Sequence, residues 1–353
     1  MRETPERFLD LLHRVVQRVH LTRAQAKAAI GALVTEGATT QAQVGALLTA
    51  WRMKGETADE LAGAVDALRE RMVTLPRPEG RIVVDTCGTG GDGQHTFNIS
   101  TAAALVAASA GLAVAKHGNR AVSSRAGSAD VLQALGVHIE AEPERLSACL
   151  QTHGFAFLFA PRFHPAMRLV ASARRELGLR TLFNLVGPLV NPVGADAQVI
   201  GVFDAGYLDL MADVAHCVGL RRALIVHARD GQDELSPCAP TDAVLVTGDE
   251  KRRLVLTPED AGLARAPMGS ITGGDAKENA RIIEGVFAGA RDASREAVLL
   301  NAGAALWMSG AEPDLRAGVA RATLAVDEGA AARTLLNVKR ALSAAPTHDA
   351  ENR

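Results

Sequence analysis

Residues 93–129 contain neither aspartate nor glutamate, although the chain as a whole has 40 acidic residues against 38 lysines and arginines. The basic side chains of this stretch therefore have no carboxylate beside them in the sequence to neutralise their charge. Positive charge concentrated in one segment favours an anionic ligand. The basic residues are His95, Lys116, His117, Arg120 and Arg125.

A glycine-rich segment, CGTGGDGQHTFNIST, overlaps the start of this stretch. Its glycines at 88, 90, 91 and 93 let backbone N–H groups turn towards one point without obstruction by Cβ atoms. Asn98, Ser100 and Thr101 follow at the predicted start of a helix, where unpaired N–H groups and the helix dipole attract anions. The segment therefore predicts a phosphate-binding loop.

Two common nucleotide-binding motifs fit this loop poorly. Gly88, Gly90 and Gly93 form a literal GxGxxG, but a dinucleotide site needs an acidic residue about 20 positions further on. The acid-free stretch excludes such a residue. A P-loop needs Lys-Ser/Thr after its last glycine, whereas Gln-His follows Gly93. The segment thus indicates a phosphate site of another kind.

Further polar residues are predicted at the same place. Lys116, His117 and Asn119 end a predicted strand, and open α/β sheets bind ligands at the carboxyl ends of their strands. A second helix start follows with Ser123, Ser124, Gly127 and Ser128. Together these features predict a site for a multiply phosphorylated ligand. The alternative is a solvated basic loop whose serines cap a helix.

An acidic pair, Asp233-Glu234, follows another predicted strand and a turn. Adjacent carboxylates at this edge of a sheet suit a hard cation such as Mg²⁺, which keeps several waters and accepts phosphate oxygens as further ligands. From the residues alone, an exposed acidic turn is the alternative. The four cysteines have no metal-ligand spacing, and we expect a reduced, cytoplasmic protein.

Short apolar runs suited to buried strands alternate with helical segments after residue 80. Aromatic residues make up only 3% of the chain, which favours helices packed on a parallel sheet over a β-sandwich. We therefore predict an α/β fold with a mostly parallel, doubly wound central sheet flanked by helices. The predicted strands are 81–86, 112–117, 155–160, 197–203, 222–228 and 242–247.

A smaller, all-helical domain is predicted before the sheet. Apolar positions recur at helical spacing through residues 5–74, with Thr22, Thr40 and Thr57 as expected helix caps, and the proline-rich segment 75–80 follows. No continuous apolar segment predicts a signal peptide or a membrane span.

The helical domain is predicted to be discontinuous. A helix and an irregular Gly/Pro segment interrupt the alternation of strands and helices, and we expect about residues 163–190 to rejoin residues 1–74. The large α/β domain would then consist of residues 75–162 and 191–353.

Several motifs together resemble those of the anthranilate phosphoribosyltransferases. They are GTGGD with the following NIST, KHGNRAVSS with GSAD, RTLFNLVGPLVNP, DE followed by APT, and LNAGAAL. They occur in the family's order over nearly the whole chain. The resemblance implies transfer of the phosphoribosyl group of phosphoribosyl pyrophosphate (PRPP) to the amine of anthranilate. The products would be N-(5-phosphoribosyl)anthranilate and pyrophosphate, in the second step from chorismate in tryptophan biosynthesis.

The resemblance also implies roles for individual residues. Lys116, His117, Asp233 and Glu234 would serve catalysis. Gly88, Asn119 and Arg174 would contact anthranilate, the choice of Arg174 over Arg175 resting on the alignment of SARRELG. Two Mg²⁺ ions would bind at Ser100, Asp233 and Glu234. PRPP would contact Gly88, Gly91, Asp92, Thr96, Asn98, Ile99, Ser100, Thr101, Lys116, His117, Gly118, Asn119, Arg120, Ala121, Val122, Ser123, Ser124 and Ser128.

The expected partners are these small-molecule substrates and a second copy of the chain, bound through the helical domain. A net charge of −2 gives no general attraction for nucleic acid, and we expect no membrane association. Two alternatives remain. A nucleoside phosphorylase would consume a nucleoside and inorganic phosphate. A non-catalytic relative that binds nucleic acid would need a basic surface outside the cleft.

Overall fold

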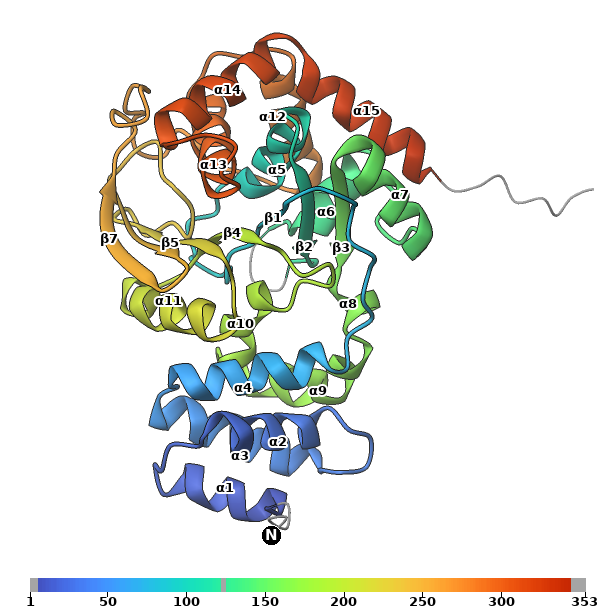
Figure 1. Ribbon diagram of the computed structural model, residues 1–353, viewed down its shortest axis with the longest axis vertical. Coiled ribbons are helices and arrows are strands. Elements are labelled where there is room, and N and C mark those ends of the chain that lie inside the picture. The colour runs from blue at the N-terminus through green and yellow to red at the C-terminus, as the bar shows by residue number, and fades with distance from the viewer. Residues whose placement is uncertain (1–5, 122–124, 344–353) are drawn as a thin grey trace, which may run out of the picture.

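A computed structural model describes residues 6–121 and 125–343 of the chain. It has one sheet with helices on both faces, as predicted, and four N-terminal helices at one end (Figure 1). Within the described residues, no helix combines the length and the apolar character needed to cross a membrane.

The sheet has seven strands in the order β3-β2-β1-β4-β5-β6-β7. The first five in this order are parallel, whereas β6 and β7 are antiparallel, so the predicted mostly parallel sheet is confirmed. All six predicted strands occur, and β7 was not predicted. The strands are β1 (Val83–Thr86), β2 (Ala113–Gly118), β3 (Phe155–Phe159), β4 (Ala197–Gly201), β5 (Arg222–Ala228), β6 (Thr241–Thr247) and β7 (Glu250–Leu256).

The order of the strands determines where a ligand can bind. The chain runs outward from β1 through β2 to β3 and then returns to place β4 on the other side of β1. Loops leaving β1 and β4 therefore diverge to opposite sides, which opens a crevice at the carboxyl ends of these strands. The glycine-rich loop follows β1 and thus lies at this point.

The larger of two hydrophobic clusters contains β1, β2 and β3 and one face of β4 and β5, and it includes Leu105 of α5 and Leu306 of α13. Most of its helices lie at the end of the molecule opposite the N-terminal helices (Figure 1). The helices concerned are α5 (Ile99–Ser109), α6 (Ser128–Ala134), α7 (Pro143–His153), α12 (Ala276–Phe287), α13 (Ala293–Met308), α14 (Leu315–Asp327) and α15 (Ala330–Leu342).

The second cluster joins the N-terminal helices to the opposite face of the sheet, where Ile200 and Ile225 pack with Met211 of α11. It also includes Val170 and Phe183, which belong to the segment between β3 and β4. That segment contains α8 (Ala160–Phe163), a 3-10 turn, α9 (Arg168–Leu177), α10 (Leu182–Val186) and a second 3-10 turn. The other helices are α1 (Phe8–Val16), α2 (Arg23–Leu33), α3 (Gln41–Lys54), α4 (Ala58–Arg69) and α11 (Leu208–Cys217).

Local sequence explains where the N-terminal helices begin. Thr22, Thr40 and Thr57 each accept a hydrogen bond from the backbone N–H three residues later, as expected of an N-cap. The residue at that third position, Gln25, Gln43 or Glu60, accepts a bond in return from the N-cap N–H through its side chain, which completes a capping box.

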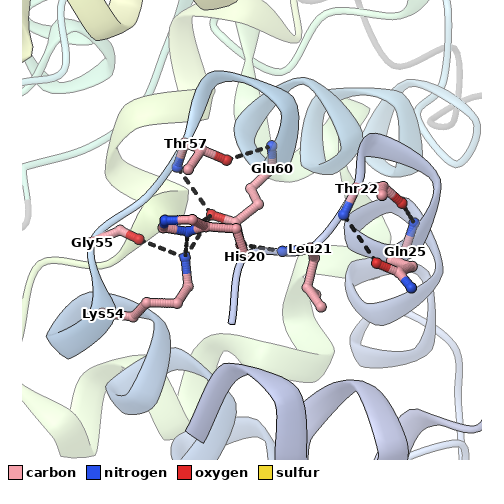
Figure 2. A network of polar contacts seen from close by, with 8 residues as sticks. All are labelled: His20, Leu21, Thr22, Gln25, Lys54, Gly55, Thr57 and Glu60. Carbon is pink, nitrogen blue, oxygen red and sulfur yellow. Dashed lines mark hydrogen bonds and ion pairs between the residues drawn. The ribbon is translucent and has the colours of Figure 1, made fainter. Parts of the chain in front are cut away.

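A buried ion pair holds the junction between α2, α3 and α4 (Figure 2). The side chains of Lys54 and Glu60 are 1% and 0% exposed, and their charged atoms lie 2.7 Å apart. Glu60 also accepts hydrogen bonds from the backbone N–H groups of Leu21 and Thr57, while Lys54 donates to the carbonyl of Gly55. Removing either partner would leave the other charge buried and unpaired, which would lower the free energy of unfolding by roughly 3–5 kcal/mol.

Candidate active site

A cavity of about 620 Å³ lies at the carboxyl ends of β1 and β2. On the sheet side it is lined by the glycine-rich loop, the start of α5 and the loop after β2. On the opposite side it is lined by the segment between β3 and β4, together with Leu68 of α4. A ligand in this cavity would therefore contact the α/β layer and the helices of the second cluster at once.

Most of the predicted site residues line this cavity. They are Gly88, Gly91, Asp92, Thr96, Asn98, Ser100, Thr101, Lys116, His117, Gly118, Asn119, Ser128, Arg174, Asp233 and Glu234. Three predicted residues lie elsewhere. Ile99 is buried, Arg120 pairs with Asp130 at 2.9 Å, and Ala121 does not line the cavity. Val122, Ser123 and Ser124 lie outside the described residues.

Backbone contacts hold the glycine-rich loop beside the ends of β4 and β5. Thr89 donates its N–H to the carbonyl of Gly201 over 2.8 Å, and its hydroxyl accepts from the N–H of Phe203 over 3.1 Å. The next N–H, that of Gly90, donates to Oδ2 of Asp233 over 2.8 Å. Gly90, Gly91 and Gly93 have φ near +70°, which glycine adopts without strain. The loop is thus pinned against the acidic pair.

The start of α5 is tied to the acidic pair and to Lys116. The N–H of Ser100 donates to Oε1 of Glu234 over 2.9 Å, and the Ser100 hydroxyl accepts from Nζ of Lys116 over 3.3 Å. The hydroxyl of Thr101 is buried without a hydrogen-bond partner among the described residues. Buried polar atoms are nearly always paired, so an unpaired hydroxyl beside a cavity favours a bound ligand.

Lys116 is the cation in the floor of the cavity. It is only 2% exposed and donates from Nζ to the carbonyl of Thr86. Burial raises the pKa of nearby Asp85 to about 6, and the charge of Lys116 opposes this rise. Asp85 also accepts from the His117 N–H over 3.2 Å and from Nδ2 of Asn191 over 2.8 Å. Asp85 therefore holds the end of β2 in place, and Lys116 is not tied to it by a direct ion pair.

The carboxylates of the acidic pair accept from the N–H groups of Gly90 and Ser100, and neither forms an ion pair with a basic side chain within the described part of the chain. Removal from water raises the pKa of Asp233, and repulsion from Asp92 raises it further. Burial likewise raises the pKa of Glu234, with repulsion from Asp233 as the second cause. A bound cation would strongly stabilise the ionised form of carboxylates whose pKa is raised in this way.

The donor set around the acidic pair consists of oxygens, the ligands that Mg²⁺ prefers. Within the described residues, no group of three or more His, Cys, Asp or Glu side chains could enclose a metal ion alone. A Mg²⁺ ion would therefore need waters or ligand phosphate oxygens to complete its coordination, as is usual for sites that bind it with a phosphorylated substrate.

Arg174 supplies positive charge on the helical side of the cavity. Its guanidinium lies 5.2 Å from the centre of the Phe183 ring, and burial lowers its pKa. It forms no ion pair within the described residues, whereas a guanidinium with a planar fork of donors suits a carboxylate. Arg175 is exposed and does not line the cavity, so the geometry favours Arg174 for an internal contact.

Two histidines meet between the two sides of the cavity. The rings of His117 and His164 lie 5.1 Å apart, and Nδ1 of His117 lies 3.2 Å from the carbonyl oxygen of Gly187. Burial lowers the pKa of His117 to about 3 and that of His164 to about 4, so both are neutral at pH 7. Their Nε2 atoms are buried without a partner in the described structure.

Sequence reasoning missed much of the helical side of the cavity. The sequence favours a structural role for His164. Most of the other residues lie in the RTLFNLVGPLVNP motif, whose residue types indicate no particular chemistry. The side chains concerned are mostly apolar, and only packing brings them to the sheet edge. They include His164, Met167, Ala171, Phe183, Asn184, Val186, Pro188 and Val190.

Comparisons with known proteins agree with this architecture. Residues 80–332 match the "Glycosyl transferase family, a/b domain", and residues 9–72 match its helical bundle domain. The anthranilate phosphoribosyltransferase of Myxococcus xanthus is 51% identical over 92% of this chain and 96% of the relative.

Two solved structures are also similar. One is the crystal structure of anthranilate phosphoribosyltransferase from Thermus thermophilus, with a TM-score of 0.89 and 43% identity over 95% of this chain and 100% of the other. Another is the Saccharomyces cerevisiae enzyme in complex with PRPP and Mg, with a TM-score of 0.85 and 28% identity over 96% and 99%. The chain belongs to the anthranilate phosphoribosyltransferases, a group of pentosyltransferases within the glycosyl transferase family.

Proposed function

We propose that the cavity binds PRPP against the sheet edge and anthranilate against α9 and α10, and that the chain transfers the phosphoribosyl group to the aromatic amine. The observation that carries this proposal is the division of charge within one cavity. Lys116 and the start of α5 lie on the sheet side, whereas Arg174 lies on the helical side. PRPP is multiply phosphorylated, and anthranilate carries one carboxylate, so the two substrates match the two sides.

The reaction is a displacement at the anomeric carbon of PRPP. The bond from this carbon to the pyrophosphate oxygen breaks as the bond to the amine nitrogen forms, through an oxocarbenium-like transition state. Lys116 and backbone N–H groups of the glycine-rich loop stabilise the growing charge on the departing pyrophosphate. Arg174 and Asn119 hold the amine in line with the carbon, which lowers the entropic part of the barrier.

Two Mg²⁺ ions are proposed to bind at Ser100, Asp233 and Glu234, where they would neutralise charge on the leaving pyrophosphate. The yeast relative was solved with PRPP and Mg, which supports the choice of metal. In the present chain Asp233 and Glu234 accept from the N–H groups of Gly90 and Ser100, so the same carboxylates also order the loop and the helix start.

His117 is proposed to position anthranilate and not to act as a strong base. The amine becomes strongly acidic only as the new bond forms, so it needs little help to lose its proton. A pKa of about 3 keeps the imidazole neutral, and a neutral ring adds no charge beside Lys116. Its unpartnered Nε2 can form one hydrogen bond with a ligand.

Arg174→Ala is expected to raise the KM for anthranilate by about tenfold to a hundredfold, since a charge-assisted hydrogen bond contributes roughly 1.5–3 kcal/mol. The KM for PRPP should change little, because Arg174 lies on the other side of the cavity. Release of pyrophosphate, measured against the concentration of each substrate, gives both constants. Arg175→Ala is the matched control, because this neighbouring arginine is exposed and outside the cavity lining. Equal effects of the two variants would refute the assignment.

The two sides of the cavity are proposed to belong to two domains that close on the substrates. The helical domain would contain residues 1–74 and about 163–190, and the α/β domain residues 75–162 and 191–353. Packing of Val170 and Phe183 in one cluster with the N-terminal helices supports this division. Closure would exclude water from the reacting atoms. We also propose a cytoplasmic location, in keeping with four cysteines that are all free.

A homodimer through the helical domain is proposed as well. Leu9 and Val16 of α1 and Met53 of α3 are 46%, 59% and 70% exposed, and an interface through the helical domain would cover them. We expect sedimentation equilibrium at micromolar concentration to give the mass of two chains. A Leu9→Glu/Val16→Glu variant should sediment as one chain, whereas Leu324→Glu, at an exposed leucine of α14, should not change the mass. A wild-type monomer would contradict the proposal.

The nucleoside phosphorylase alternative shares the architecture, but the relatives described above do not favour it. A role in nucleic-acid binding would need a basic surface, and the net charge of −2 gives no support for one.

A further inference from the structure

The loop between β1 and α5 is supported by a segment far away in the sequence, residues 271–279. Thr96 and Thr272 form an isolated antiparallel bridge. On either side of it, the N–H of Gly273 donates to the carbonyl of His95 over 2.8 Å, and the N–H of Phe97 donates to the carbonyl of Ile271 over 3.3 Å. The proposed phosphate loop is thus paired, backbone to backbone, with the segment that precedes α12.

Gly273 is needed for this close approach. A Cβ atom at this position would lie 2.6 Å from the backbone N and Cα of Phe97. Real Cβ contacts are not this short, so any other residue would push the two segments apart. The supporting segment therefore holds the loop at backbone distance and not through flexible side chains.

A chain of three hydrogen bonds continues from this pairing into the cavity. The N–H of Gly274 donates to Oδ1 of Asn279 over 2.7 Å. Nδ2 of Asn279 donates to Oδ1 of Asn98 over 3.0 Å. Nδ2 of Asn98 then donates to the carbonyl oxygen of Ala126 over 3.1 Å. The chain links the loop after β1 to the loop after β2, the two segments that form the sheet side of the cavity.

The two ends of this chain fix the orientation of both amides. A backbone N–H can only donate, so Asn279 must turn its oxygen towards Gly274 and its NH₂ towards Asn98. A carbonyl oxygen can only accept, so Asn98 must turn its NH₂ towards Ala126 and its oxygen towards Asn279. Both requirements agree. Asn98 lines the cavity with one donor and one acceptor position still available for a ligand.

We infer that Asn279 is a positioning residue for the PRPP site, which sets the amide orientation of Asn98 and ties the two phosphate loops together. This inference rests on the proposed function. Asn279 is 2% exposed and does not line the cavity, so it acts through Asn98 without touching substrate. A polar side chain buried at the start of α12 is otherwise unexplained, since Asp275 already caps this helix.

The test is a double-mutant cycle on PRPP affinity, with Asn98→Ala, Asn279→Ala and the double variant. We expect Asn279→Ala to raise the KM for PRPP about tenfold, near the effect of one lost buried hydrogen bond, while the KM for anthranilate changes less than about twofold. In the Asn98→Ala background, Asn279→Ala should raise the KM for PRPP by less than about a further twofold, because the hydrogen bond through which Asn279 acts is already absent.

Asn279→Asp is measured in parallel because it has nearly the same shape. It still accepts from Gly274 but, when ionised, offers no donor to Asn98 and adds negative charge near the phosphate site, so a rise in the KM for PRPP at least as large is expected. Val338→Ala, in the buried face of α15 far along the chain, is the control for lost stability. It should lower the Tm without raising the KM for PRPP relative to the KM for anthranilate.

The outcomes are distinguishable. Additive effects of Asn98→Ala and Asn279→Ala in an active enzyme would overturn the role of Asn279 and leave the proposed function intact. Equal rises in both KM values would do the same, since they would indicate a general structural effect. If wild-type protein shows no turnover of PRPP with anthranilate, the proposed function itself fails.

Discussion

We expect the Asp233→Ala/Glu234→Ala variant to lose turnover by on the order of a thousandfold or more, because a metal ion at a developing charge contributes several kcal/mol to the transition state. The variant also removes acceptors for the N–H groups of Gly90 and Ser100, so the glycine-rich loop loses one of its anchors. Initial rates at saturating substrates and Mg²⁺ measure the effect.

An exposed acidic pair provides the matched control. Asp249 lies in the turn between β6 and β7, and Glu250 begins β7. Both are exposed and outside the cavity lining, so Asp249→Ala/Glu250→Ala should keep wild-type rates. Calorimetric titration with Mg²⁺ in the presence of PRPP should give two ions for the wild type and fewer for the Asp233→Ala/Glu234→Ala variant. Normal kinetics in that variant would remove the metal assignment.

Lys116→Met is expected to lower kcat/KM for PRPP by about a hundredfold to a thousandfold, the range found when one preorganised donor to a developing negative charge is removed. Methionine keeps the apolar stem in β2 and deletes the charge together with the hydrogen bonds to the Thr86 carbonyl and the Ser100 hydroxyl. The kinetics should be measured together with Tm, because Asp85 then loses the cation that favours its ionised form.

Lys27→Met is the control for the loss of a lysine. Lys27 pairs with Glu70 on the surface of the helical bundle, and exposed pairs of this kind contribute little. An unchanged kcat/KM in Lys116→Met would contradict the electrostatic role assigned to this residue.

Structural features that follow from local sequence patterns were predicted well. Short apolar runs placed all six buried strands, because strands covered on both faces carry continuous hydrophobic sequence. This criterion did not predict strand β7. It is an edge strand with the sequence EKRRLVL, and Lys251 and Arg253 pair with Asp213 and Asp209 of α11 instead of entering the core.

The candidate site was predicted unevenly for a similar reason. The sheet side carries charged and glycine-rich motifs that are visible in the sequence. The helical side is formed by residues such as His164 and Phe183, which only the packing of α8–α10 brings to the cavity. Asn279 gives the clearest example, since 181 residues separate it from Asn98 and nothing in the sequence around it indicates a role.

The most direct test of the central claim is the fluorescence of anthranilate followed over time with the purified chain, with PRPP added or omitted and Mg²⁺ present or chelated. We predict a decay that requires both PRPP and Mg²⁺ and that releases one pyrophosphate for each anthranilate consumed. Folded protein that leaves the fluorescence unchanged at high concentrations of both substrates would contradict the account.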